Sequence, residues 1–499
     1  MDKKSEMPES KKYAATYGGT LVSGLPMVVM LGGILVCAFT GLRSPICYWS
    51  AGVLSIIIGF FIYKDKREFS EAILEGIGNR ILRTMMFALF FAGIMSKIIA
   101  AGGLVSGLIW LTSTINMPAA LIPEISFLIA ALMSTATGTS LGTVTAIAPI
   151  LVPLAAALGS HVPLTCGAIL SGAVFGDNLA PVSDTTIASS LTQQTEVGRV
   201  VRSRIKYSLL GGGISSVLFI VLGFTMSQSG IGHTVEADPA TAINLVFLIV
   251  PALVVILMLK TSNLITSLLM GDLAGFVLLF LMGRIDYEGF AGKEGLVANG
   301  ISGMVNVTVF VWFIFIVTGI VQKAGTLDKM IEWLQTKAKT SRSAEIICNC
   351  ITTCIVVCIV SSSASCALGG ALERNIIAPY HIARDRTANM LDGMACGVAG
   401  LLPYSSNVLT IINIAVTAGA MAEGASPFDV LAYNFHCMAL VLIFWVCAIT
   451  GWGRTYETDE QLAAEGIFLD PTTSVPVPAG AKISKYQYNG VHGGKVSKE

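Results

Sequence analysis

Charged residues are scarce in this sequence. Only 12% of the 499 residues are Asp, Glu, Lys or Arg, whereas 54% are hydrophobic. Soluble domains carry about 25% charged residues, so this composition excludes an ordinary soluble protein. The 31 basic and 31 acidic residues give a formal net charge of zero. Because the chain has no excess of either sign, we expect no nucleic-acid partner.

Other absences narrow the class further. The chain lacks sustained alternation of polar and apolar residues, which argues against a transmembrane barrel. The polar start is followed by an apolar run without a cleavage signature, which predicts an uncleaved first span. The 11 cysteines imply no disulfide framework. Cys350, Cys354 and Cys358 share one helix face, where soft-metal ligation is the alternative to the favoured interpretation as small buried apolar groups.

Long stretches without charge dominate what remains. The longest lies between Glu124 and Asp177. A helix needs about 20 apolar residues to cross a bilayer, so this stretch holds more than one crossing. We therefore expect an all-α polytopic membrane protein with about ten transmembrane helices. The predicted spans are 21–41, 45–63, 84–101, 163–178, 207–227, 242–260, 262–283, 309–323, 387–403 and 428–451.

Two apolar stretches, 119–158 and 343–380, are interrupted near the middle by small hydroxyl residues. We interpret both as re-entrant helical hairpins, since non-helical backbone at membrane depth needs protein or a wet cavity around it. The alternative is two ordinary spans each, with hydroxyl groups joining neighbouring helices. The interrupting residues that we assign to a site are Ser134, Thr135, Thr137, Thr139 and Ser140 in the first stretch, and Ser361, Ser362 and Ser363 in the second.

The distribution of Lys and Arg sets the orientation, because cytoplasmic loops hold the excess of these residues. With a cytoplasmic N-terminus and non-crossing hairpins, 27 of the 31 basic residues fall on the cytoplasmic side. If either hairpin crossed fully, the following loops would exchange sides and this segregation would disappear. We expect a multi-pass protein of the cell (inner or plasma) membrane with both termini in the cytoplasm.

The chain also resembles itself at an offset of about 220 to 227 residues. AGGLVSGLIWL (101–111) aligns with AGTLDKMIEWL (324–334), and Gly172, Gly176 and Pro181 align with Gly393, Gly397 and Pro403. Each half holds five spans and one hairpin, so the halves must be inverted relative to each other, as in many secondary transporters. The predicted organisation is a cytoplasmic N-terminus (1–20), two repeats (21–230 and 240–453) and a disordered cytoplasmic tail (455–499).

The string SGAVFGDNLAPVSDTTIASS, residues 171–190, carries the chemistry. Pro181 disfavours helix at the preceding residue, so the helix is expected to break beside two carboxylates. An oxygen-rich cluster suits Na⁺, and desolvation lets a proton compete for the same carboxylate. The alternative is a helix end at the interface with Asp184 as its N-cap. The predicted ion and proton ligands are Asp177, Asn178, Ser183, Asp184, Thr185 and Thr186, with Na⁺ at Asp177 and Asp184.

GDNLAPVSDTT resembles the signature of the NhaC-type Na⁺/H⁺ antiporters, a family of the ion transporter superfamily. The resemblance covers about residues 20–450. It implies two re-entrant hairpins and unwound helices around one site, moving against a scaffold domain. Ala180 stands where the family pattern usually has Ser, which puts ion selectivity in doubt. Relatives in this superfamily also exchange organic anions such as malate and lactate.

The second half does not repeat the acidic motif, so neutral oxygens are expected there, from Ser405, Ser406 and Asn407. Two further carboxylates are candidate proton relays. Asp392 lies one turn before Gly397, with a pair to Arg386 as the alternative. Asp272 lies within a span, where burial of a charge is expensive, with a structural pair to Lys97 or a backbone group as the alternative. Glu124 is expected at the outer interface.

These observations favour a secondary antiporter that exchanges Na⁺ for H⁺ by alternating access. The first alternative is a Na⁺- or H⁺-coupled exchanger of small organic anions or amino acids, in which Arg374, close to the second hairpin's serines, would bind the anionic group. The second alternative is a passive channel. The GTSLG string at 138–142 lacks the strand-turn-helix context of a nucleophile elbow, so we expect no enzyme. No cofactor is predicted. The expected partners are the lipid bilayer and a small inorganic cation, with a homodimer as an open alternative.

Overall fold

The computed structural model is all-helical in the part of the chain it describes. Nine of the described helices are long and apolar enough to cross a membrane, and the described extended pairing consists of isolated bridges. The described residues are 13–40, 46–114, 117–181, 183–227, 238–261, 263–326, 329, 333–334, 336–463, 467, 469, 474–478 and 480–484. The predicted site residues all lie in these ranges, whereas much of the N-terminal and C-terminal segments lies outside them.

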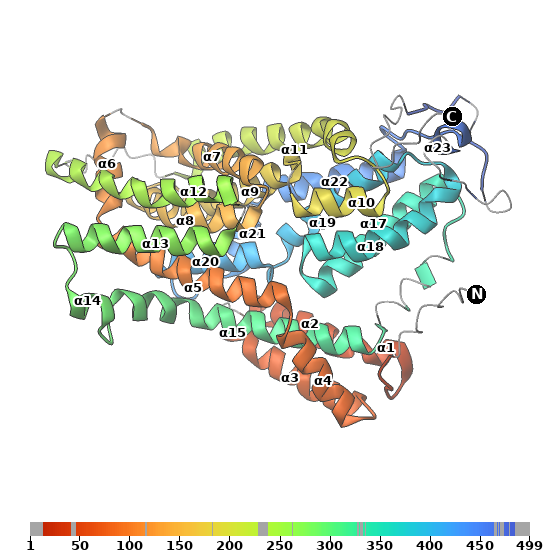
Figure 1. Ribbon diagram of the computed structural model, residues 1–499, viewed down its shortest axis with the longest axis horizontal. Helices are drawn as coiled ribbons and strands as arrows, with labels where there is room; N and C mark the ends of the chain where they lie inside the picture. The colour runs from red at the N-terminus through yellow and green to blue at the C-terminus, as the bar shows by residue number, and fades with distance from the viewer. Residues whose placement is uncertain are drawn as a thin grey trace, which may run out of the picture. The chain divides into compact units, whose positions relative to one another are not determined.

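The chain forms two compact units (Figure 1). The first combines Met1–Met86 with Val305–Trp333. Its core surrounds Tyr63, whose hydroxyl donates to the Ile320 carbonyl at 2.5 Å. Phe69, Ala72 and Ile316 pack in the same buried cluster. The helices that contribute to this unit are α1 (Gly19–Ser23), α2 (Leu25–Phe39), α3 (Tyr48–Ile62), α4 (Lys66–Ile77), the start of α5 (Arg80–Ala101) and the later part of α15 (Leu296–Lys323).

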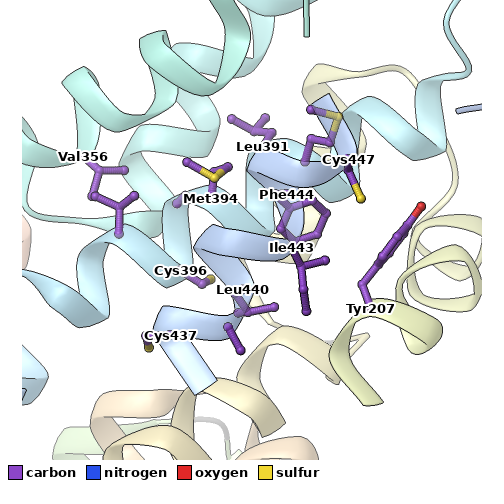
Figure 2. Close-up of a cluster of buried hydrophobic side chains, with 14 of the residues drawn as sticks. Tyr207, Val356, Leu391, Met394, Cys396, Cys437, Leu440, Ile443, Phe444 and Cys447 are labelled. Carbon is purple, nitrogen blue, oxygen red and sulfur yellow. The ribbon is translucent and has the colours of Figure 1, made fainter. Parts of the chain in front are cut away.

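The second unit, Phe87–Met304 with Leu334–Glu499, contains all predicted site residues. One of its cores is a buried cluster on α11 (Val197–Met226), α17 (Ser341–Ile359), α19 (Arg384–Leu401) and α22 (Phe435–Thr450). Figure 2 shows Leu440, Ile443 and Phe444 of α22 beside Leu391 and Met394 of α19. This apolar packing holds α19 in place. The unit's other helical segments are α6 (Leu104–Thr114), η2 (Pro239–Leu248), α12 (Ile249–Thr261), α13 (Leu264–Leu281), α14 (Tyr287–Ala291) and α21 (Pro427–Leu431).

Helices occur at all ten segments predicted as spans, but two begin well before the apolar run. α11 begins at Val197 rather than at 207, and α15 begins at Leu296 rather than at 309. In α11 the first turns carry Arg199 and Arg204, both buried. Paired basic residues of this kind can sit inside a helix. The two helices therefore extend beyond the predicted spans.

Each predicted hairpin stretch is interrupted where the hydroxyl residues lie. α7 (Ile122–Thr137) ends at Gly138, which has φ 68°, and α8 (Ser140–Ala157) begins after the N-cap Thr139. α17 ends at Val360, with φ 58°, and α18 (Ser362–Ile377) begins after the N-cap Ser361. A left-handed residue followed by a hydroxyl cap ends one helix and starts the next. The two stretches are thus interrupted in the same way, by a left-handed residue and a hydroxyl N-cap.

A second kind of break follows each stretch. α9 (Val162–Leu179) is separated from α10 (Asp184–Thr192) by four residues, and α19 is separated from α20 (Ser406–Thr417) in the same way. Ser140 and Ser362, which begin α8 and α18, are 222 positions apart, and so are Ser183 and Ser405, which precede α10 and α20. The packing is reciprocal, because α10 contacts α18 and α20 contacts α8.

Part of the C-terminal tail, expected to be solvated, makes defined contacts. Glu457 is buried and pairs with Arg199 at 3.0 Å and with Arg384 at 2.9 Å. His381, after η3 (Ala378–Tyr380), lies 2.9 Å from Asp459 of α23 (Asp459–Ala463). The tail as far as α23 is therefore attached to the ends of α11 and α19. Residues 485–499 lie outside the described residues.

Candidate functional site

Asp177 lies at the centre of the predicted motif, in the last turn of α9. Its side chain accepts a hydrogen bond from the Ser183 hydroxyl at 2.6 Å and one from the Ser140 backbone N–H at 3.2 Å. Ser183 precedes α10, and Ser140 begins α8, so three helix ends meet at one carboxylate. Asp177 is 8% exposed. The positive N-terminal end of α8 favours a negative charge at this point.

Two glycines explain why α9 can approach the first break so closely. A Cβ on Gly172 would collide with the Phe127 carbonyl of α7, and a Cβ on Gly176 would collide with the Ala131 carbonyl. α9 therefore packs backbone to backbone against α7. This packing places Asp177, the next residue, beside the start of α8.

The glycines aligned in the second half face another helix. A Cβ on Gly393 would meet Phe444, and one on Gly397 would meet Val441, both on α22. The glycine pairs are 221 positions apart, whereas the helix breaks are 222 apart. One residue turns a helix face by about 100°. The glycine alignment is therefore not a structural equivalence.

A buried ion pair lies next to Asp177. Arg204 of α11 is 2.5 Å from Asp392 of α19, and both side chains have 0% relative exposure. The same guanidinium donates to Thr186 at 2.9 Å, to Asn389 at 3.0 Å and to the carbonyl of Asn178. Thr186 in turn donates to Asp392 at 3.1 Å. Arg204 thus joins the broken end of α9, α10 and α19.

Hydroxyl and thiol groups connect the two carboxylates. The oxygens of Ser183 and Thr185 are 2.9 Å apart. The Cys396 thiol lies 3.8 Å from the Thr185 hydroxyl and 3.2 Å from Asp392. The order Asp177, Ser183, Thr185, Cys396, Asp392 is therefore a continuous polar path through a buried region. We call these five residues, with Asn178, Thr186 and Arg204, the polar network.

The hydroxyl residues of the first break divide into two roles. Ser140 belongs to the site, because its backbone contacts Asp177 and its hydroxyl accepts from Asn407 at 3.0 Å. Ser134 donates to the Ala173 carbonyl of α9 at 2.5 Å. Thr135 and Thr137 donate to carbonyls within α7 and Thr139 caps α8, so these three stabilise local structure.

Asn407 belongs to the second half and forms a hydrogen bond at the first break. It lies in the first turn of α20 and bonds Ser140. Ser405 is buried before α20, and Ser406 begins that helix. Ser361 caps α18, and Ser362 and Ser363, which follow it, are partly buried. The described contacts do not connect these serines to Asp177.

Asp184 is placed differently from its neighbours. It lies in the first turn of α10 with an exposed side chain, whereas Thr185 and Thr186 beside it are buried. Within the described contacts Asp184 does not join the polar network. Its role as a Na⁺ ligand stays a prediction.

The pairings given as alternatives for Asp392 and Asp272 are not found among the described residues. Arg386 does not pair with Asp392, because it binds Glu345 at 2.6 Å while Asp392 binds Arg204. Lys97 donates to the Thr417 carbonyl at 3.0 Å. Asp272, buried in α13, has no hydrogen-bond partner among the described residues on either carboxylate oxygen, neither Lys97 nor a backbone group.

One charged residue lies elsewhere than expected. Arg374 lies about 16 Å along α18 from Ser363, at 1.5 Å per residue, so it is not close to the serines. Glu124 is buried and accepts a hydrogen bond from Ser216 of α11, and its place at the outer interface stays a prediction.

Arg204, Cys396 and Ser208 are the network partners that sequence reasoning missed. Arg204 was counted as a cytoplasmic loop charge. A signal was present in the helical spacing of small and polar residues along α11, where Arg204, Ser208, Gly211 and Ser215 form one buried stripe. Ser208 donates to the Asn178 side chain at 2.9 Å.

Apolar helices of membrane length, broken around a buried network of carboxylates, hydroxyls and one arginine, define a multi-pass membrane transport protein. Comparison with known families supports this class and makes it specific. A model of the Na⁺/H⁺ antiporter family matches residues 45–224 and 231–452. The chain belongs to this family.

Characterised relatives span nearly the whole chain. The malate-2H⁺/Na⁺-lactate antiporter of Bacillus subtilis is 25% identical over 88% of this chain and 97% of its own length. The Na⁺/H⁺ antiporter NhaC of Alkalihalophilus pseudofirmus is 24% identical over 88% of this chain and 96% of its own. The arginine/ornithine antiporter ArcD of Halobacterium salinarum is 24% identical over 79% and 84%. The resemblance to NhaC-type antiporters is therefore confirmed.

Proposed function

We propose that this protein exchanges Na⁺ for H⁺ across the membrane, and that Asp177 carries either ion in turn. The observation that carries the proposal is the setting of Asp177, buried at the meeting point of α8, α9 and α10 with hydroxyl oxygens around it. A carboxylate and neutral oxygens suit a hard monovalent cation. Since one carboxylate cannot hold both ions, protonation releases Na⁺ and deprotonation restores the site.

Alternating access requires the site to face each side in turn, and the breaks around Asp177 supply the elements for this. We assign 119–158 and 343–380 as re-entrant hairpins of two inverted repeats, with both termini in the cytoplasm. The equal offset of the breaks and the reciprocal packing of α10 on α18 and α20 on α8 support this assignment. Asp184, exposed beside the network, would provide an acidic approach for cations from water.

Arg204 weighs against the organic-anion alternative. A substrate carboxylate would need a cationic partner in the site, and Arg204, which lies within the polar network, already pairs with Asp392. Uptake of labelled malate, lactate or arginine into proteoliposomes tests that alternative. Stoichiometric movement of such a substrate without detectable Na⁺/H⁺ exchange would exclude the proposed function.

Exchange itself is tested in proteoliposomes that contain a pH-sensitive dye and receive an outward or inward Na⁺ gradient. Wild type should show Na⁺-dependent proton flux. Asp177→Asn should reduce it at least about tenfold, because an amide neither carries a proton nor neutralises Na⁺. Asp286→Asn is the matched control, since Asp286 is an exposed N-cap and Asn caps equally well. Unchanged flux in Asp177→Asn would show that the site lies elsewhere.

Competition for one carboxylate also fixes the direction of the pH dependence. As the pH falls, a growing share of Asp177 is protonated, so the apparent half-saturation concentration of Na⁺ should rise. The limit for one shared site is about tenfold per pH unit. A Na⁺ half-saturation that is independent of pH would contradict a shared site.

A further inference from the structure

Arg204 is the basic residue of the polar network, where its charge pairs with that of Asp392. Its side chain is fully buried, and its ion pair with Asp392 is supported by bonds to Thr186, Asn389 and the Asn178 carbonyl. Separating the pair would leave each charge buried and without a partner, so the pair resists separation. Asp392 is therefore already neutralised before any transported ion arrives.

Asp177 has no such partner. Among the described residues the ion pairs include Arg204 with Asp392 and none with Asp177. The neighbours of Asp177 are the Ser183 hydroxyl and the Ser140 N–H, both uncharged. The polar network thus contains two carboxylates and one guanidinium, which leaves one negative charge uncompensated.

Three other acidic groups of this unit lie outside that count. Asp184 is exposed and therefore solvated. Glu373 is buried between α17 and α18, where it accepts from Thr352. Asp272 lies on α13. The described contacts connect none of these carboxylates to Asp177.

We propose that Arg204 determines the ion stoichiometry of this protein by reserving Asp392, so that the site takes one monovalent cation per cycle and exchange moves no net charge. The inference rests on the proposed function. A site with one uncompensated carboxylate becomes neutral with one Na⁺ or with one H⁺, and both loaded forms then cross the membrane uncharged. A divalent cation would leave the buried site positive, so Ca²⁺ and Mg²⁺ are excluded for the same reason.

The test uses the purified full-length protein in proteoliposomes with a Na⁺ gradient, a pH dye and a K⁺ diffusion potential set by valinomycin. For an electroneutral exchanger the final proton gradient is the same at every imposed potential. A cycle that moves one net charge would shift the final ion ratio about 50-fold for each 100 mV imposed. If the proton flux depends on Na⁺ and its rate or final gradient also shifts with the potential, the inference is overturned and the proposed function stands. Absence of any Na⁺-dependent proton flux overturns both.

Variants separate a charge-setting role from a merely structural one. Arg204→Lys keeps the charge and should keep a Na⁺ Hill coefficient of about 1 and independence of the potential. Arg204→Gln frees Asp392 and should raise the Hill coefficient toward 2 or make exchange depend on the potential. A folded Arg204→Gln protein that behaves like wild type in both measurements contradicts the inference.

The double variant Arg204→Gln/Asp392→Asn keeps the test decisive if the single variant does not fold. It removes both charges of the pair and leaves Asp177 as the uncompensated carboxylate. We expect its Na⁺-dependent exchange, whatever its rate, to be independent of the potential and to have a Hill coefficient of about 1. Potential-dependent exchange in the double variant would show that Arg204 and Asp392 do not set the number of ions exchanged per cycle.

Discussion

The Asp177 carboxylate faces one donor that can also act as a cation ligand and one that cannot. The Ser183 hydroxyl donates to it in the described state, but a hydroxyl has two lone pairs and can turn them toward a cation. The Ser140 N–H cannot do so and holds the carboxylate in place. The same few atoms can therefore stabilise the empty, the protonated and the Na⁺-bound site.

Removing the Ser183 hydroxyl should weaken Na⁺ binding. A hydrogen bond to a charged group contributes about 1.5–3 kcal/mol, so Ser183→Ala should raise the half-saturation concentration of Na⁺ in the exchange assay about 10- to 100-fold. Ser189→Ala is the control, because this buried hydroxyl of the same helix bonds only the Thr186 carbonyl in the described contacts. Equal effects of the two substitutions would argue against Ser183 as a ligand.

The residues of the site were predictable only where the chain itself brings them together. Asp177, Asn178, Ser183, Thr185 and Thr186 are close in sequence, and Pro181 indicates the break between them. Arg204 and Cys396 reach the site from other helices, and no local sequence pattern indicates which charged residues pair. Asp184 lies in the same motif, but its place there did not indicate that its side chain is exposed.

At the scale of helices, close contact between α7 and α9 decides where Asp177 lies. Gly172→Ala should destabilise the protein, because the added methyl group meets the Phe127 carbonyl. Overpacking of this kind costs about 1–3 kcal/mol. Gly213→Ala in α11 meets no atom within 4 Å and should stabilise by up to about 1 kcal/mol through helix propensity. Thermal unfolding in detergent measures both, and a rise in stability for Gly172→Ala would contradict the close packing.

The tail connects the ends of two helices. Glu457 pairs with Arg199 in the first turn of α11 and with Arg384 in the first turn of α19. Breaking a buried ion pair costs about 3–5 kcal/mol, so Glu457→Gln should lower the thermal midpoint clearly. Glu460→Gln, an exposed carboxylate of the same tail, should not. Equal midpoints for both variants would show that the tail does not stabilise these helix ends.

Helix breaks were easier to predict than helix starts. Clusters of Ser and Thr indicated the interruptions at Gly138 and Val360, because hydroxyl side chains cap new helices. The extension of α11 before the predicted span was not indicated by hydropathy, which treats Arg199 and Arg204 as loop residues, because their partners Glu457 and Asp392 are distant in sequence.

At the scale of the whole molecule, the proposed re-entrant hairpins predict which loop ends share a side. In a background without native cysteines, Pro118→Cys lies just before the first hairpin and Ala156→Cys lies near its end, both at exposed positions. Both should react with a membrane-impermeant thiol reagent from outside the cell. Lys339→Cys, before the second hairpin, should react only after permeabilisation.

The two cysteines at the ends of the first hairpin test whether the chain returns to the side from which it entered. If 119–158 crossed the membrane once in total, Pro118→Cys and Ala156→Cys would lie on opposite sides. Opposite accessibility would therefore exclude the hairpin and the orientation based on Lys and Arg. A fully crossing hairpin would also remove the inverted relation between the repeats.

The most direct measurement of the central claim is proton release on Na⁺ binding. The purified protein is held in weakly buffered detergent solution at a pH where Asp177 is protonated, and NaCl is added against a choline chloride control. A shared carboxylate predicts that about one proton leaves for each Na⁺ bound, and that Asp177→Asn releases none. Saturable Na⁺ binding by wild type without proton release, or equal release by Asp177→Asn, would contradict exchange at Asp177.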